Sequence, residues 1–127
     1  MSPPPQRSFA FRPAEHLRRP VDFRRVYQRK RSASDAWLIV YACENDLGFL
    51  RVGFSVGRKV GPATHRSRLR RLYREAFRLT RHEMPVGLDL VLIPRCSEEP
   101  PLEALKQSLP RLVQQLGCKL AREACRS

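Results

Sequence analysis

The sequence predicts an α+β fold, an α/β sandwich in which three helices pack on a small sheet. Apolar residues at helical spacing mark three segments as helices, and apolar or alternating runs between turn residues mark the strands. Hydrophobic residues make up 42% of the 127 residues, enough for a buried core, which excludes wholesale disorder. The length suits one domain, expected over residues 13–127 after a flexible, proline-rich basic tail at residues 1–12.

The first helix is expected over about residues 19–30. Phe23, Val26 and Tyr27 stand at i, i+3 and i+4, and Pro20 suits the first helical position. Basic side chains surround this aromatic stripe. Aromatic residues at helical spacing more often belong to a core than to a ligand site, so core packing is the plain alternative for these rings.

Two strands are expected next. Residues 37–43 form an apolar run rich in β-branched and aromatic residues, which predicts a buried strand. After a turn at residues 44–48, residues 50–56 alternate cleanly, which predicts a second strand antiparallel to the first. Its apolar side chains share one face, and Arg51, Gly53 and Ser55 share the other.

The longest helix is expected to begin near Pro62 and to end before Pro85. Its core-facing stripe at helical spacing comprises Leu69, Leu72, Tyr73, Ala76 and Phe77. A third strand follows over residues 88–93, and a last helix over about residues 101–125 carries leucines at helical spacing. Pro110 is expected to kink or split that last helix.

The charge of the chain indicates a polyanionic partner. The net charge is +13, and residues 1–83 hold +12 of it, with 19 basic and 7 acidic side chains. Nucleic acid is the first candidate and an anionic membrane surface the second. No apolar run approaches the ~20 residues of a membrane span, and the first residues lack the apolar core of a secretory signal. We therefore expect a cytoplasmic protein.

Much of this charge lies on the longest predicted helix. Residues 62–82 hold seven arginines and one glutamate, and Arg66, Arg70, Arg74 and Arg78 stand four apart. Like charges at this spacing destabilise an isolated helix, so the ridge favours contact with phosphates over a merely solvated face. The preceding loop adds Arg58 and Lys59 between Gly57 and Gly61, where backbone amides can approach an anion.

The segment that joins this strand, loop and helix resembles the signature of a known family. Residues 51–78 read RVGFSVGRKVGPATHRSRLRRLYREAFR. The bacterial ribonuclease P protein component reads roughly R-x-G-x-S-V-x-K-K-x-G-N-A-V-x-R-N-R-x-K-R-x-x-R-E-x-F-R. The resemblance covers about residues 17–116, including Phe23, Val26 and Tyr27 upstream and residues 90–95 downstream. Ser67 stands where the family has its central asparagine.

The resemblance implies a fold, an activity and partners. The fold would be a mixed sheet of about four strands with three helices, in the order αβββαβα, as in a ribosomal-protein-like domain. The activity would be Mg²⁺-dependent endonucleolytic removal of the 5′ leader of precursor tRNA, with catalysis and the Mg²⁺ residing mainly in the RNA subunit. The expected partners are the catalytic RNA and precursor tRNA, without DNA or membrane.

The resemblance also assigns roles to residues, none of them catalytic or metal-ligating. Contact with the catalytic RNA is expected at Arg58, Lys59, Arg66, Ser67, Arg68, Arg70, Arg71 and Arg74. A cleft for the leader is expected at Phe23, Tyr27, Tyr41, Arg51 and Ser55. Aromatic rings there would stack on bases without sequence preference, and the bare Gly53 would leave space for a single strand.

Other functions remain open on the sequence alone. A structural ribosomal protein, or another RNA-binding protein of the same fold, is the first alternative. A DNA-binding regulator is weaker, because the arginine helix carries few base-reading side chains and no helix-turn-helix partner precedes it. A protein nuclease is disfavoured because the histidines, carboxylates and cysteines show no catalytic or metal-ligand spacing.

Overall fold

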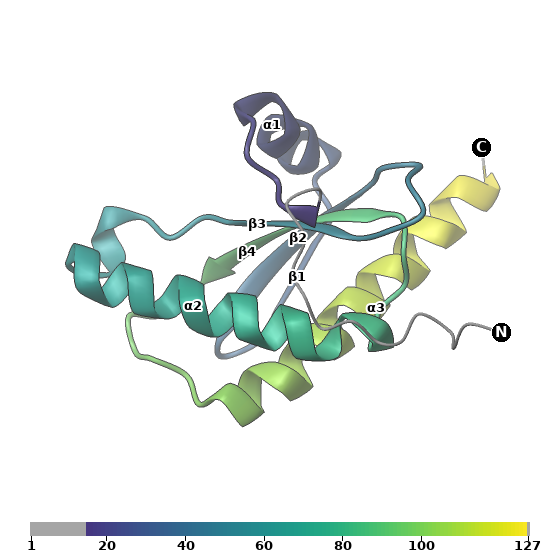
Figure 1. Ribbon diagram of the computed structural model, residues 1–127. Coiled ribbons are helices and arrows are strands. Elements are labelled where there is room, and N and C mark those ends of the chain that lie inside the picture. Colours follow the sequence, from purple (N-terminus) through teal and green to yellow (C-terminus); the bar gives the residue numbers. More distant parts are fainter. Residues whose placement is uncertain (1–14, 127) are drawn as a thin grey trace, which may run out of the picture.

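The structure is a computed structural model that describes residues 15–126 (Figure 1). The order of its elements is α1 (Pro20–Arg29), β1 (Ser32–Ser34), β2 (Leu38–Glu44), β3 (Arg51–Phe54), α2 (Ala63–Thr80), β4 (Leu88–Pro94) and α3 (Leu102–Arg126). Two short 3₁₀ turns, η2 (Arg58–Val60) and η3 (Arg81–Glu83), flank α2. The predicted order αβββαβα is confirmed. The expected tail at residues 1–12 lies outside the described residues.

The sheet has four strands in the spatial order β1-β2-β4-β3. β2 pairs antiparallel with β1 and, over its whole length, with β4, whereas β3 pairs parallel with β4. β2 and β3 therefore run in opposite directions, as predicted, but β4 lies between them and they do not pair. β4 takes the central place because it is buried on both faces, and α2 supplies the crossover that a parallel neighbour requires.

The two faces of the sheet are covered unequally (Figure 1). α2 and α3 pack together on one face, and α1 alone crosses the other. The larger core lies under α2 and α3, where Leu38, Val40 and Leu90 of the sheet are fully buried. The predicted stripe of α2 is confirmed, with Leu72 only partly buried at its margin. Among the described residues, no helix is long and apolar enough to cross a membrane.

The last helix is one uninterrupted element, so of the two effects expected of Pro110, a kink or a split, the split is wrong. Leucines on both sides of the proline, including Leu105, Leu109 and Leu112, are buried in the same core. Pro110 is itself buried, and it lacks the backbone N–H group that would donate a helical hydrogen bond. The tertiary packing of these leucines keeps the helix continuous despite that lost hydrogen bond.

The hydroxyl of Tyr73 offers a test of this core. The side chain is fully buried, and its hydroxyl has no hydrogen-bond partner among the described residues. Burial raises the pKa of the phenol, so the group stays an uncharged donor. Because an unsatisfied buried donor is destabilising, Tyr73→Phe is expected to raise the free energy of unfolding by about 1 kcal/mol in urea denaturation. Tyr27→Phe, on a partly exposed ring, is the control, and a loss of stability in Tyr73→Phe would contradict the assignment.

Candidate nucleic-acid interface

The loop before α2 is folded against the helix by two of the predicted arginines. Arg66 Nε donates to the carbonyl oxygen of Gly61 at 3.2 Å, and Arg70 Nη2 lies 3.5 Å from that of Val56. Gly61 adopts a φ of 153°, which L side chains rarely adopt, and it closes the η2 turn that carries Arg58 and Lys59. The basic loop and the helix therefore form one continuous surface.

We call this the α2 basic surface, formed by Arg58, Lys59, Arg66, Arg68, Arg70, Arg71 and Arg74. The arginines at 66 and 70 are half-buried, and the other members are exposed. Among the described residues, only Arg68 has a carboxylate within 4 Å, that of Glu99 at 3.8 Å. The structure thus brings together all of the cations predicted to contact the catalytic RNA, and within residues 15–126 almost all of them have no carboxylate within 4 Å.

Several basic residues elsewhere in the fold are paired with carboxylates. Arg29 binds Glu44 and Glu123, and Arg81 lies 2.6 Å from a carboxylate oxygen of Glu15. Arg78, the fourth member of the predicted arginine ridge, is bound by Glu75 on its own helix at 2.7 Å, and this hydrogen bond lowers the pKa of Glu75. The ridge is therefore neutralised at its C-terminal end, and its unpaired part ends at Arg74.

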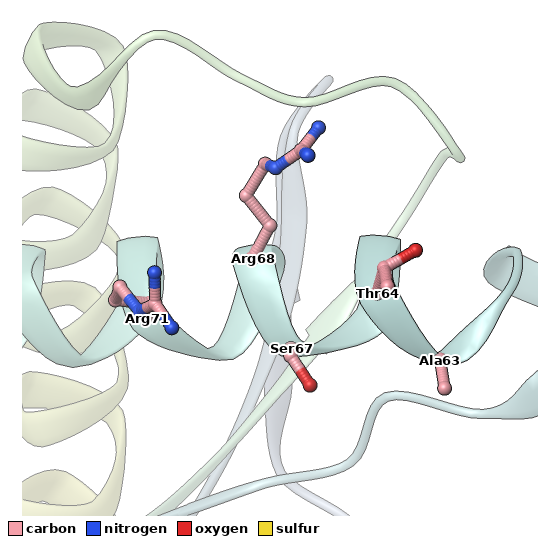
Figure 2. Close-up of a pocket in the computed structure, with 5 residues that line it drawn as sticks. All are labelled: Ala63, Thr64, Ser67, Arg68 and Arg71. Carbon is pink, nitrogen blue, oxygen red and sulfur yellow. The ribbon is translucent and has the colours of Figure 1, made fainter.

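An open hollow of about 320 Å³ marks the outer side of the α2 basic surface (Figure 2). Its lining consists of Ala63, Thr64, Ser67, Arg68 and Arg71. Figure 2 shows Arg68 pointing toward the loop that leads to α3, and Ser67 pointing to the other side of the helix. Ser67 is exposed, so its hydroxyl is accessible to a ligand beside the guanidinium groups.

A second candidate surface lies on the other face of the sheet, beside α1. Phe23 and Tyr27 of α1 pack with Tyr41 and Ile93 of the sheet around a small buried core. The rings of Tyr27 and Tyr41 meet edge to face, with centroids 5.1 Å apart and an interplanar angle of 80°. All four side chains remain partly exposed. The aromatic residues predicted for a leader cleft are thus gathered at one place, where they serve both packing and an accessible surface.

The expectation that Gly53 leaves space for a nucleic-acid strand is wrong. Gly53 is buried, and a Cβ atom built on it would lie 2.5 Å from Phe23 Cζ and 3.0 Å from Leu17 Cβ. The missing side chain admits the ring of Phe23 instead of a ligand. Gly53 therefore sets how closely α1 approaches the sheet. Ser55 follows the end of β3, where it is half-buried.

Arg51, also predicted for the cleft, is bound by a carboxylate that sequence reasoning missed. Asp89 is fully buried at the position on β4 that faces Arg51, and its oxygens accept hydrogen bonds from Arg51 at 2.8 and 2.6 Å. Asn45 donates to it at 2.8 Å, and Arg25 of α1 binds it from the other side. Arg25 and Arg51 also lie 3.8 and 3.7 Å from a carboxylate oxygen of Asp22.

We call these five residues the Asp89 cluster. Burial alone would raise the pKa of Asp89, but the hydrogen bonds from Arg51, Asn45 and Arg25 outweigh burial and hold that pKa below its usual value. The carboxylate is therefore charged at neutral pH. A signal for it exists in the sequence, because Asp89 is the one charged residue in the apolar run of residues 88–93.

The donor set does not favour a metal ion held by the protein alone. Among residues 15–126, no group of three or more His, Cys, Asp or Glu side chains is placed to hold one. Carboxylates such as those of Glu44, Asp89 and Glu123 are bound to arginines, and His65 Nε2 lies 2.6 Å from the carbonyl oxygen of Ser97. The four cysteines are free thiols, two of them exposed on α3.

Comparison with known proteins identifies relatives of this arrangement. Residues 11–117 match the family described as Ribonuclease P. The ribonuclease P protein component of Chloroflexus aggregans is 41% identical over 106 residues, which are 82% of this chain and 78% of that protein. That of Thermoanaerobacter sp. is 36% identical over 98 residues, 76% of this chain and 84% of the relative. The solved RNase P protein from Thermotoga maritima is 33% identical with a TM-score of 0.73, covering 80% of this chain and 96% of its own.

Proposed function

Because this chain belongs to the family of ribonuclease P protein components, we propose that it binds the catalytic RNA and the 5′ leader of precursor tRNA. In that role it assists the Mg²⁺-dependent endonucleolytic removal of the leader. Family membership makes the chain a subunit of an endoribonuclease, a ribonucleoprotein that processes tRNA. Catalysis is proposed to lie in the RNA subunit.

The observation that carries the proposal is the set of unpaired cations on the α2 basic surface. Several arginines elsewhere in the fold bind carboxylates, yet among the described residues only Glu99 approaches this surface. Cations without a carboxylate partner can exchange their counterions for phosphates, and the released counterions supply the binding free energy. Arginine adds a planar fork suited to phosphate oxygens. The surface thus suits the backbone of a structured RNA.

The aromatic cleft suits a different part of the substrate. A leader has no fixed sequence, so its recognition must tolerate every base. Partly exposed rings such as Phe23, Tyr27 and Tyr41 offer stacking worth about 1–3 kcal/mol per base without sequence preference. The catalytic RNA on α2 and the leader beside α1 would then occupy opposite faces of the sheet, and the protein would hold the two RNAs in a fixed relation.

Magnesium completes the proposed reaction, and it supplies charge neutralisation at the phosphates being cleaved. The α2 basic surface offers guanidinium groups for RNA phosphates instead of carboxylate ligands for metal ions, so the ions are proposed to be held mainly by the RNA. Arg66 and Arg70, fixed by the carbonyl groups of the preceding loop, would keep the docked RNA in register with the sheet.

Reconstitution tests this function. The purified chain is mixed with the ribonuclease P RNA of the same organism, and 5′ maturation of precursor tRNA is followed at low Mg²⁺ concentration. We expect cleavage to be faster than with the RNA alone. RNA binding without any stimulation would instead indicate a structural ribosomal protein or another RNA-binding protein of the same fold.

Gly53 provides a test of the cleft itself. In Gly53→Ala the new Cβ would overlap Phe23, so the ring must move away from the sheet. We expect holoenzyme affinity for precursor tRNA to fall by about tenfold, the equivalent of part of one stacked base, while affinity for mature tRNA is unchanged. Gly48→Ala is the matched control, because nothing lies within 4 Å of a Cβ atom there. Equal reductions for precursor and mature tRNA would place the effect outside the leader cleft.

A further inference from the structure

A groove of about 240 Å³ lies at the free edge of the sheet, between β1 and the C-terminal half of α3. Its lining consists of Ser32, Ala33, Ser34, Gln115, Leu116, Lys119 and Arg122. We call it the β1–α3 groove. β1 occupies the edge opposite β3, so the groove is remote from the loop that carries Arg58 and Lys59.

The two cations of this groove resemble most members of the α2 basic surface, because they are exposed and unpaired among the described residues. Lys119 and Arg122 are both exposed, and neither has a carboxylate partner among residues 15–126. Two other cations of α3 are paired, since Lys106 lies 3.4 Å from Glu103 and Arg111 lies 2.8 Å from Asp35. The unpaired charge on this helix is therefore concentrated beside the groove.

The groove borders the face of the sheet that carries the aromatic cleft. Ser32 stands opposite Tyr41 and Ser34 opposite Ile39 in the antiparallel register, so both serines lie on the cleft face of the sheet. Ser34 accepts a hydrogen bond from Arg95 at 2.9 Å, which brings another cation to this edge. The four strands span three interstrand spacings, roughly 14 Å from β3 to β1.

We propose that the β1–α3 groove binds phosphates of the precursor leader, upstream of the nucleotides that stack in the aromatic cleft. This inference rests on the proposed function. If the catalytic RNA docks on α2 and the leader crosses the sheet, nucleotides farther from the cleavage site reach β1 and then the side chains of Lys119 and Arg122. The hydroxyl of Ser32 and the outward backbone groups of the edge strand add hydrogen-bonding partners along this path.

Single-stranded RNA fits this groove better than an acidic peptide does. The lining offers hydroxyl, amide and cationic groups beside the small side chain of Ala33, and its one large apolar side chain, Leu116, is buried in the core. A peptide would need apolar pockets for its anchoring side chains. A phosphodiester chain needs only spaced cations and hydrogen-bond partners.

The test compares leader lengths in the reconstituted holoenzyme. Precursors with leaders of about 4 and about 12 nucleotides are bound, a range typical of single-strand surfaces. We expect Lys119→Ala/Arg122→Ala to weaken binding of the long-leader precursor by about fivefold to tenfold and to flatten its salt dependence by about 1.4 in slope. Binding of the short-leader precursor is expected to stay unchanged. Both side chains are exposed, so the fold should be retained, which circular dichroism verifies.

The matched control is Lys106→Ala/Arg111→Ala, which removes the same charge from the same helix outside the groove. Equal effects of the two double variants, equal effects on both leaders, or no effect on either would overturn the proposal. The wild-type protein with the short leader separates the two hypotheses. If the wild-type protein stimulates cleavage of the short-leader precursor, but Lys119→Ala/Arg122→Ala leaves the affinity for the long-leader precursor unchanged, only the groove assignment fails. If it does not stimulate cleavage, the proposed function itself fails.

Discussion

Asp89→Ala is expected to lower the free energy of unfolding by about 3 kcal/mol. Removing one partner of a buried ion pair leaves the other without its counter-charge, and here two guanidinium groups lose the same carboxylate. Arg25 and Arg51 retain 39% and 21% side-chain exposure, so water relieves part of the cost and keeps it near the lower end for such pairs. Urea denaturation of the purified protein measures the change.

The pH dependence supplies an independent check with a definite sign. The folded pKa of Asp89 is lowered, so its contribution is fully present above the unfolded value of about 3.9 and is lost as the pH falls toward the folded value. Asp89→Asn keeps the shape but cannot be charged. We therefore expect the free energy of unfolding of the wild type to exceed that of Asp89→Asn by a constant amount above about pH 5. This difference should shrink at lower pH.

Asp46→Asn is the control for this titration. Asp46 is an exposed carboxylate whose backbone φ of 57° asparagine tolerates, so this change alters one charge without disturbing the turn. If the difference in the free energy of unfolding between wild type and Asp89→Asn does not depend on pH, the packing of Asp89, and not its charge, holds α1 to the sheet.

The Asp89 cluster also bears on the proposed leader cleft. Asp22 and Arg25 belong to α1, whereas Asn45, Arg51 and Asp89 belong to the sheet and its loop. The cluster thus joins the helix to the sheet at one end of the cleft, and Gly53 sets the spacing beside it through Phe23. The predicted contact of Arg51 with the leader would therefore be a second role beside this ion pair.

The sequence predicted those parts of the fold that depend on local pattern. The stripe from Leu69 to Phe77 requires one buried helical face, and the alternation of residues 50–56 requires one buried strand face, wherever the partners come from. Strand neighbours do not follow from such patterns. The apolar run of β4 fits any buried position, and only the assembled sheet places it between β2 and β3.

In the candidate site, too, the sequence predicts the local features but not the contacts made by distant segments. The arginine count of α2 is visible in the sequence, but which of these side chains meets a carboxylate depends on distant segments and on helix geometry. Arg78 and Arg74 look alike in the sequence, yet Glu75 binds Arg78 and leaves Arg74 without any carboxylate among the described residues. The prediction for Gly53 fails for a related reason, because the ring that fills its space comes from α1.

Replacing Arg71 and Arg74 together with alanine is expected to lower affinity for the catalytic RNA by at least about tenfold at moderate salt. Both side chains are exposed, and no carboxylate binds either of them in the described part of the chain. Removing one cation from a phosphate should flatten the slope of log affinity against log salt by about one, so the double variant should flatten it by about two. Filter binding over a salt series measures both quantities. Lys106→Ala/Arg111→Ala removes the same charge from α3 and is the control.

A change of opposite sign completes this test. Glu75→Gln removes the carboxylate that binds Arg78 at 2.7 Å, so it raises the positive charge at the end of the α2 basic surface without altering any arginine. If phosphates lie along this face, affinity for the catalytic RNA should rise and the salt slope should steepen by up to about one. An unchanged slope in Glu75→Gln, together with a flattened slope in Arg71→Ala/Arg74→Ala, would place the end of the docked RNA between Arg74 and Arg78. Unchanged slopes in both variants would show that α2 faces solvent in the holoenzyme.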